Sequence, residues 1–152
     1  MKKLALIILF CITLTGCGSE IDTELIKLES EINTFCDRVV QIDTAINQIT
    51  NITLDEAGLE TATSELMHNL DMLKDEFVKL SNIDFPEEYT YLETLADEAS
   101  DYMTEAVKSY HTVYEENYNE SMEEYAQENY SRAYKRVKLI LNALQGDDST
   151  TQ

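Results

Sequence analysis

Apolar residues recur at alternating intervals of four and three positions between residues 21 and 49. The members of this series are Ile21, Leu25, Leu28, Ile32, Phe35, Val39, Ile42, Ile46 and Ile49. The average interval of about 3.5 residues places all of these side chains on one face of a helix. The pattern therefore predicts a helix over about residues 21–50, roughly 45 Å long, that packs along its whole length against other helices.

A second helix is predicted directly after a short interruption at residues 50–53. The chain holds one proline and four glycines, so long uninterrupted helices are favoured. Thr53 and Glu56 have the spacing of a capping box, which marks a helix start. The apolar series that follows, again in steps of three and four, is Leu59, Ala62, Leu66, Leu70, Leu73, Phe77 and Leu80.

The segment from Asn82 to Pro86 separates the second helix from a third. Asp84 can cap a helix and Pro86 suits a first turn, so a third helix is predicted from there to about residue 117. A fourth is predicted from about Glu120, with Gly146 as its C-terminal cap. The apolar residues of these two helices are Leu92, Leu95, Ala99, Tyr102 or Met103, Ala106, Tyr110 and Val113, then Met122, Ala126, Tyr130, Ala133, Val137, Ile140 and Leu144.

Four helices with short connections predict an all-α, up-down-up-down antiparallel four-helix bundle over residues 21–146. The fourth helix has the poorest apolar stripe, so a three-helix bundle with a loosely packed fourth helix is the alternative. Residues 147–152 are expected to form a disordered tail. The seam of the first helix could equally serve a homodimer.

The N-terminus has the features of an export signal. A basic start, Met1-Lys2-Lys3, precedes an apolar run from Leu4 to Leu14. This run would reach only about 16 Å as a helix, which is short of the roughly 30 Å core of a membrane. A basic start, a short apolar region and small residues at its end are typical of a cleaved signal peptide.

Leu14-Thr15-Gly16-Cys17 resembles the lipobox of bacterial lipoproteins. The resemblance implies a diacylglyceryl group on the sulfur of Cys17 and cleavage between Gly16 and Cys17. Residues 1–16 would then be the signal peptide and 17–20 a lipidated tether. Two acyl chains suffice for stable anchoring, so the chain is expected on the extracytoplasmic face of the cell membrane.

The cysteines fit this interpretation. Once Cys11 leaves with the signal and Cys17 carries lipid, Cys36 is the one thiol left of three. An intramolecular disulfide is then excluded. Cys36 is interpreted as a small buried apolar residue, with an intermolecular disulfide as the alternative.

The charge of the chain excludes one class of partner. Thirty acidic and eleven basic residues give a formal net charge of −19. Nucleic-acid binding needs a basic surface, so this function is not expected. The acidity is interpreted as a means of keeping a surface protein soluble, in preference to a specific cation-binding role.

Neither a metal site nor an enzyme is predicted. Glu65 and His68 have the spacing of a di-iron motif, but core residue Leu66 directs His68 toward solvent, and His111 is likewise expected to point away from the core. No nucleophile elbow or phosphate-binding glycine loop is present. No catalytic residue, metal ligand or cofactor is therefore expected.

All nine tyrosines lie between residues 89 and 134. Tyrosine combines apolar area with a hydroxyl and is enriched at binding surfaces. Tyr102, Tyr110 and Tyr130 occupy predicted core positions. Tyr114, Tyr118 and Tyr125 instead surround the predicted turn between the third and fourth helices, and they are the candidate partner-binding residues.

The predicted topology orients the bundle on the membrane. The end of the fourth helix would lie beside the start of the first, so the basic residues Arg132, Lys135, Arg136 and Lys138 would lie toward the lipid. The tyrosine-bearing turn would point outward. The expected function is a non-enzymatic interaction or scaffold module that binds another envelope protein. The alternative is a small-ligand or cation-binding lipoprotein with a pocket between the third and fourth helices.

Overall fold

The computed structural model describes residues 23–50, 56–116 and 118–145, and this part of the chain is all-α. Cys17, with the signal and the tether, and the predicted tail lie outside the described residues, as do the capping residues Thr53 and Gly146. The elements are α1 (Thr23–Thr50), α2 (Glu56–Leu80), the 3₁₀ turn η1 (Glu87–Tyr89), α3 (Tyr91–His111), the π-helical turn η2 (Thr112–Glu116) and α4 (Glu120–Leu144).

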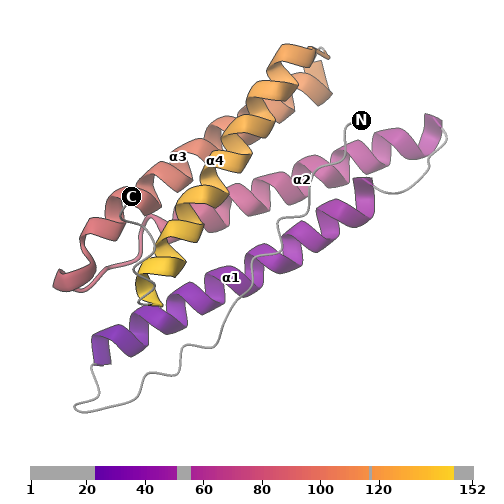
Figure 1. The fold of residues 1–152 in the computed structure, drawn as a ribbon. Coiled ribbons are helices and arrows are strands. Elements are labelled where there is room, and N and C mark those ends of the chain that lie inside the picture. Colours follow the sequence, from indigo (N-terminus) through magenta and orange to yellow (C-terminus); the bar gives the residue numbers. More distant parts are fainter. Residues whose placement is uncertain (1–22, 51–55, 117, 146–152) are drawn as a thin grey trace.

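The four helices form an up-down bundle in which each helix packs on the next in sequence. Figure 1 shows two hairpins, α1–α2 and α3–α4, with α2 and α3 in contact between them. We call the end that holds the start of α1, the start of α3 and the end of α4 the base, and the opposite end the distal end. The four-helix prediction is confirmed, and the three-helix alternative is wrong because α4 packs along α3.

The apolar seam of α1 is buried inside the chain. Leu28, Ile32, Val39 and Ile46 are at most 1% exposed. Each such side chain contributes roughly 1.5–3 kcal/mol by leaving water. Because this seam is used within the chain, a homodimer would have to use another surface.

Phe77 of α2 lies at the centre of the core. It is fully buried, and its ring meets Phe35 of α1 edge-on at 5.4 Å and Tyr134 of α4 at 5.5 Å. Edge-to-face aromatic pairs contribute about 0.5–1.5 kcal/mol beyond their buried area. The Phe77 ring therefore contacts aromatic side chains of both α1 and α4 and stabilises the packing of these helices with α2.

Small residues explain why α3 and α4 form the most extensive helix pair. The fully buried alanines on these two helices are Ala96, Ala99, Ala106, Ala126 and Ala133. Methyl side chains leave room for two helix backbones to approach closely. On the outside of the pair, Arg136 of α4 bonds Glu98 of α3.

The start of α3 differs from the prediction. Pro86 does not open the helix: it precedes the turn η1, and α3 begins at Tyr91. Phe85 is 7% exposed and packs into the core, so this connection is fixed by a buried ring rather than by a capping box. The predicted start of α4 is confirmed, because Asn119 Oδ1 accepts a bond from the Met122 amide at 3.2 Å.

Cys36 is completely buried, as predicted. Its thiol cannot reach a second chain while the fold is intact, so an intermolecular disulfide would require unfolding. None of the helices described is long and apolar enough to cross a membrane.

Candidate functional site

A cavity of about 480 Å³ opens at the distal end, between the two hairpins. It lies within the range of about 300–1,000 Å³ that is typical of small-ligand sites. Its lining comes from α1, α2, η2, the segment between η2 and α4, and the start of α4. The small-ligand alternative placed a pocket between the third and fourth helices; η2 belongs to the predicted third helix, so this cavity shares those two walls and adds two more from α1 and α2. The lining residues are Ile49, Thr50, Leu59, Ala62, Thr63, Leu66, Val113, Tyr114, Glu116, Tyr118 and Glu123.

Glu123 is the polar centre of this cavity. It is only 7% exposed, although it sits in the first turn of α4. Its Oε1 accepts a bond from the Tyr114 hydroxyl at 3.3 Å, and its Oε2 accepts one from Tyr118 at 2.9 Å. Gln127 Nε2 lies 3.4 Å from Oε1. A buried carboxylate needs such donors, and the N-terminal end of a helix also favours negative charge.

The two tyrosines remain hydrogen-bond donors at neutral pH. Burial, together with the charge of Glu123, raises the pKa of Tyr114 to about 12. The hydrogen bond to Glu123 raises the pKa of the exposed Tyr118. Both hydroxyls therefore keep their protons and hold the carboxylate in place.

The π-helical turn η2 carries Tyr114 into the cavity. Val113 in this turn is buried, and the Tyr114 ring stacks on Tyr110 at 6.1 Å with an interplanar angle of 22°. A π-helical turn changes the angular position of the residues that follow it, and such turns are frequent at functional sites. The turn thus sets the direction of one of the two donors to Glu123.

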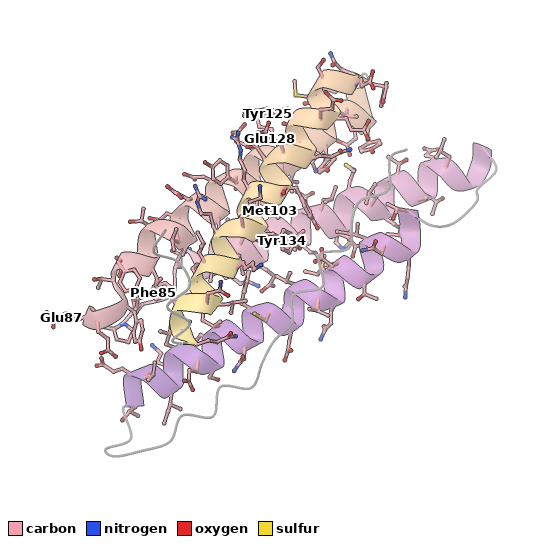
Figure 2. All side chains as sticks on the ribbon, in the orientation of Figure 1. Phe85, Glu87, Met103, Tyr125, Glu128 and Tyr134 are labelled. Carbon is pink, nitrogen blue, oxygen red and sulfur yellow. The ribbon has the colours of Figure 1, made fainter. Side chains whose placement is uncertain are left out.

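The three candidate tyrosines separate in the structure. Tyr114 and Tyr118 line the cavity and meet at Glu123. Tyr125 is 45% exposed and is not part of the lining; Figure 2 shows it with Glu128 toward the distal end of α4. Glu123 was not predicted, because the sequence places it in a run of surface glutamates.

A second buried carboxylate lies in the core, away from the cavity lining. Asp43 of α1 is 5% exposed and accepts hydrogen bonds from Tyr130 at 2.7 Å and from Tyr134 at 2.6 Å, both on α4. Burial raises the pKa of Asp43, while the two tyrosine hydroxyls oppose that shift. This cluster links α1 to α4 and was also missed, although the i, i+4 spacing of the tyrosines places them on one face.

The core tyrosines largely follow the prediction. Tyr110 and Tyr130 are buried and Tyr102 is half-buried. The guanidinium groups of Arg132 and Arg136 each lie 5.6 Å from the centre of the Tyr102 ring. Among the described residues, the buried Tyr110 hydroxyl has no hydrogen-bond partner.

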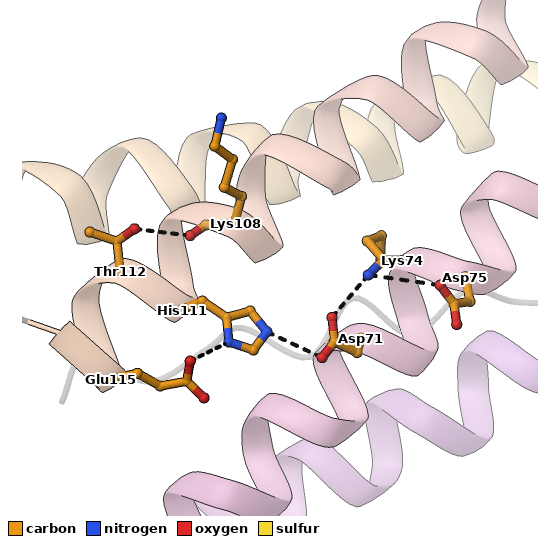
Figure 3. A network of polar contacts seen from close by, with 7 residues as sticks. All are labelled: Asp71, Lys74, Asp75, Lys108, His111, Thr112 and Glu115. Carbon is orange, nitrogen blue, oxygen red and sulfur yellow. Dashed lines mark hydrogen bonds and ion pairs between the residues drawn. The ribbon is translucent and has the colours of Figure 1, made fainter.

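His111 lies outside the buried core, but it is only partly exposed and contacts a second helix. Its side chain is 30% exposed, with Nδ1 2.8 Å from Glu115 Oε2 and Nε2 3.2 Å from Asp71 Oδ2 (Figure 3). It therefore links α3 to α2. Glu65 and His68 are exposed, as predicted for His68. Within the part of the chain described, no group of three histidine, cysteine or acidic side chains could hold a metal ion.

Burial lowers the pKa of His111, but the hydrogen bond to Glu115 and the charges of Asp71 and Glu115 outweigh it, so the net shift is upward. Lys74 bonds the same Asp71 carboxylate at 3.0 Å. The cluster is thus an ion-pair network between α2 and α3. This structural role accounts for the grouping of these charged side chains, and no ligand is needed to explain it.

Comparisons of the chain with protein-family models, curated proteins and solved structures find no match.

Proposed function

We propose that the chain is a lipid-anchored, non-enzymatic binding module on the extracytoplasmic face of the cell membrane, and that the distal cavity is its binding site. The observation that carries the proposal is the convergence of Tyr114 and Tyr118 on the buried carboxylate of Glu123 at the wall of this cavity. Mostly apolar cavities with a few converging polar groups are the usual form of small-ligand sites.

The lining favours binding over catalysis. Its described polar residues are threonines, tyrosines and glutamates, with no histidine, cysteine, lysine or arginine among them. Those four side chains supply many of the general bases, nucleophiles and charge-stabilising groups of enzymes. Glutamate can also act as a general base, but both oxygens of Glu123 already accept hydrogen bonds from tyrosine hydroxyls. Tyr114 and Tyr118 hold their protons, so they donate hydrogen bonds rather than accept protons.

The proposed anchor would hold the cavity away from the lipid. α1 begins six residues after Cys17, and six residues reach at most about 20 Å. The base would therefore stay close to the membrane surface. α1 has 28 residues, which corresponds to roughly 42 Å of helix. The distal cavity would face the space beyond the membrane.

Docking of another envelope protein at the same end is a second candidate function. Tyr118 is 68% exposed and Tyr125 is 45% exposed. Exposed tyrosines are common in protein interfaces. A cavity suits a small ligand better than a broad protein surface, so we place this candidate second.

Native mass spectrometry of the protein purified from its own membrane tests the binding site. We expect a non-covalent ligand on the wild type and on the control Tyr125→Ser, and its loss from Ala62→Leu, which fills the cavity. A ligand that survives Ala62→Leu would contradict the proposal. Loss of a bound protein in Tyr125→Ser alone would instead favour the docking function.

The same spectra test the anchor. We expect a chain that begins at Cys17 and carries the mass of a diacylglyceryl group, and a Cys17→Ser variant that lacks this mass and leaves the membrane fraction. An uncleaved N-terminus, or a Cys17 without fatty chains, would contradict the proposed anchoring.

A further inference from the structure

We propose that the distal cavity binds a small apolar organic cation: a protonated or quaternary amine attached to a hydrocarbon body. This inference rests on the proposed function and names the ligand class of the same site. It is argued from the charge at the cavity wall, from the aromatic rings beside it and from the apolar surface around it.

Glu123 has no positively charged partner among the described residues that bond it. Its described partners, Tyr114, Tyr118 and Gln127, are all neutral. A buried carboxylate is best stabilised by a positive charge as well as by hydrogen bonds. No described lining residue is basic, so the ligand itself would supply the positive charge.

Part of the cavity wall is aromatic. Tyr114 and Tyr118 bring their rings to the cavity lining next to the same carboxylate. A cation against the face of an aromatic ring gains about 0.5–2 kcal/mol, and quaternary ammonium groups are commonly recognised in this way. One face of the Tyr114 ring is covered by Tyr110, so the more exposed Tyr118, at 68%, offers the larger aromatic surface to the ligand.

The remainder of the cavity is apolar. Leu59 is 49% exposed although it is the first residue of the apolar series of α2, and it lines the cavity together with Ile49, Leu66 and Val113. A hydrocarbon body placed here would cover surface that the protein leaves open to water, which contributes about 25 cal/mol per Å² of apolar area. A bare metal ion would leave this surface uncovered.

Charge complementarity excludes the opposite ligand class. An anionic amphiphile would have to place its charge beside Glu123 and Glu116, both of which line the cavity. The formal net charge of −19 also repels anions at long range. An organic cation is attracted both by the two glutamates of the lining and by the negative net charge of the chain.

Isothermal titration calorimetry with hexyltrimethylammonium as the probe, and hexanoate as its anionic counterpart, tests the proposal. The lipidated protein is held in zwitterionic lipid nanodiscs, with empty nanodiscs as the blank. Glu123→Gln removes the charge but keeps the shape, and Ala62→Leu fills the apolar part. Glu124→Gln is the matched control, because it removes the same net charge from an exposed neighbour outside the lining.

We expect the wild type and Glu124→Gln to bind the cation and not hexanoate, and both cavity variants to bind it at least about tenfold more weakly. Circular dichroism checks that each variant retains its helices. Equal affinity in Glu123→Gln, equal binding of hexanoate, or no binding of the cation would overturn the inference. If the protein carries an anionic or neutral ligand that Ala62→Leu removes, the ligand class is wrong while the proposed function stands.

Discussion

Two buried carboxylates show how the same chemical group takes different roles in one chain. Asp43 is enclosed by Tyr130 and Tyr134 inside the core. Glu123 has comparable burial, but it lines an open cavity. The first links two helices, whereas the second is the group to which the proposed ligand would bind.

Replacing Asp43 tests its structural role. Asp43→Ala removes the acceptor of two buried tyrosine hydroxyls. The hydroxyls lie 3.3 Å apart, so one can still donate to the other, and the one left without an acceptor costs about 1–3 kcal/mol. The relief from burying a carboxylate offsets part of this cost, so we expect the free energy of unfolding to fall by about 1–2 kcal/mol in urea denaturation. Asp37→Ala, at an exposed position of the same helix, should change it by less than about 0.5 kcal/mol. Equal stability of the two variants would refute the role of Asp43.

His111 makes the stability depend on pH. Its pKa in the folded state lies above the ordinary value of 6.5, so its stabilising contribution is complete below about pH 6.5 and is lost as the pH rises through the raised value. We expect His111→Gln to lower the unfolding free energy more at about pH 5.5 than at about pH 8.5. The exposed His68→Gln is the control. The same loss at both pH values would show that the ion pairs with Asp71 and Glu115 contribute nothing.

The sequence predicts which residues lie on the same side of a helix. It does not predict which residues of one helix contact which residues of another. Tyr130 was correctly placed in the core from its spacing, and the same helical geometry puts Tyr134 beside it. That Asp43 of α1 would meet both depends on the packing of helices distant in sequence. The same holds for His111 and Asp71, which lie on different helices.

At the scale of the helices, the weak apolar stripe of α4 is the reason for the three-helix alternative, and the close packing of α4 on α3 excludes that alternative. The core positions of α4 include Ala126 and Ala133, which add little hydrophobicity but are fully buried against α3. From one helix alone, a row of alanines that packs closely looks the same as a weakly apolar face that packs loosely. The two are distinguished only when the partner helix also carries alanines at the contact. Ala96, Ala99 and Ala106 supply that match.

Close packing of α3 and α4 predicts intolerance to larger side chains. Ala133→Leu should lower the free energy of unfolding by at least about 1–3 kcal/mol, because extra methylenes in a packed interface force the helices apart. Lys135→Leu, two residues away and exposed, should change it by less than about 0.5 kcal/mol. Thermal denaturation of the two variants measures the difference. An Ala133→Leu variant as stable as the wild type would mean that α3 and α4 are not closely packed.

A helix boundary could be predicted from the sequence where a capping side chain close to it in the chain sets it. α4 begins at Glu120, as Asn119 and its bond to the Met122 amide require. α3 begins later than predicted because the preceding connection is held by the burial of Phe85. The π-helical turn η2 has no local sequence signal.

At the scale of the whole molecule, the bundle topology followed from helix count and short connections, whereas the cavity did not. Its walls come from α1, α2, η2 and α4, so it exists only once both hairpins are placed. The basic cluster on α4 is also less available than the sequence indicates. Arg132 bonds Glu128 at 2.5 Å and Arg136 bonds Glu98. The electrostatic orientation on lipid that the sequence predicts would therefore depend mainly on Lys135 and Lys138, which are exposed.

Methyl NMR of the lipidated protein in nanodiscs tests most directly whether the distal cavity is the binding site. The protein is titrated with the small-molecule fraction of its own cell envelope. We expect the methyl signals of Ile49, Leu59 and Val113 at the cavity to shift, while those of Leu28 and Leu92 at the base stay in place. Shifts at the base with an unchanged cavity, or no shift at all, would contradict the account.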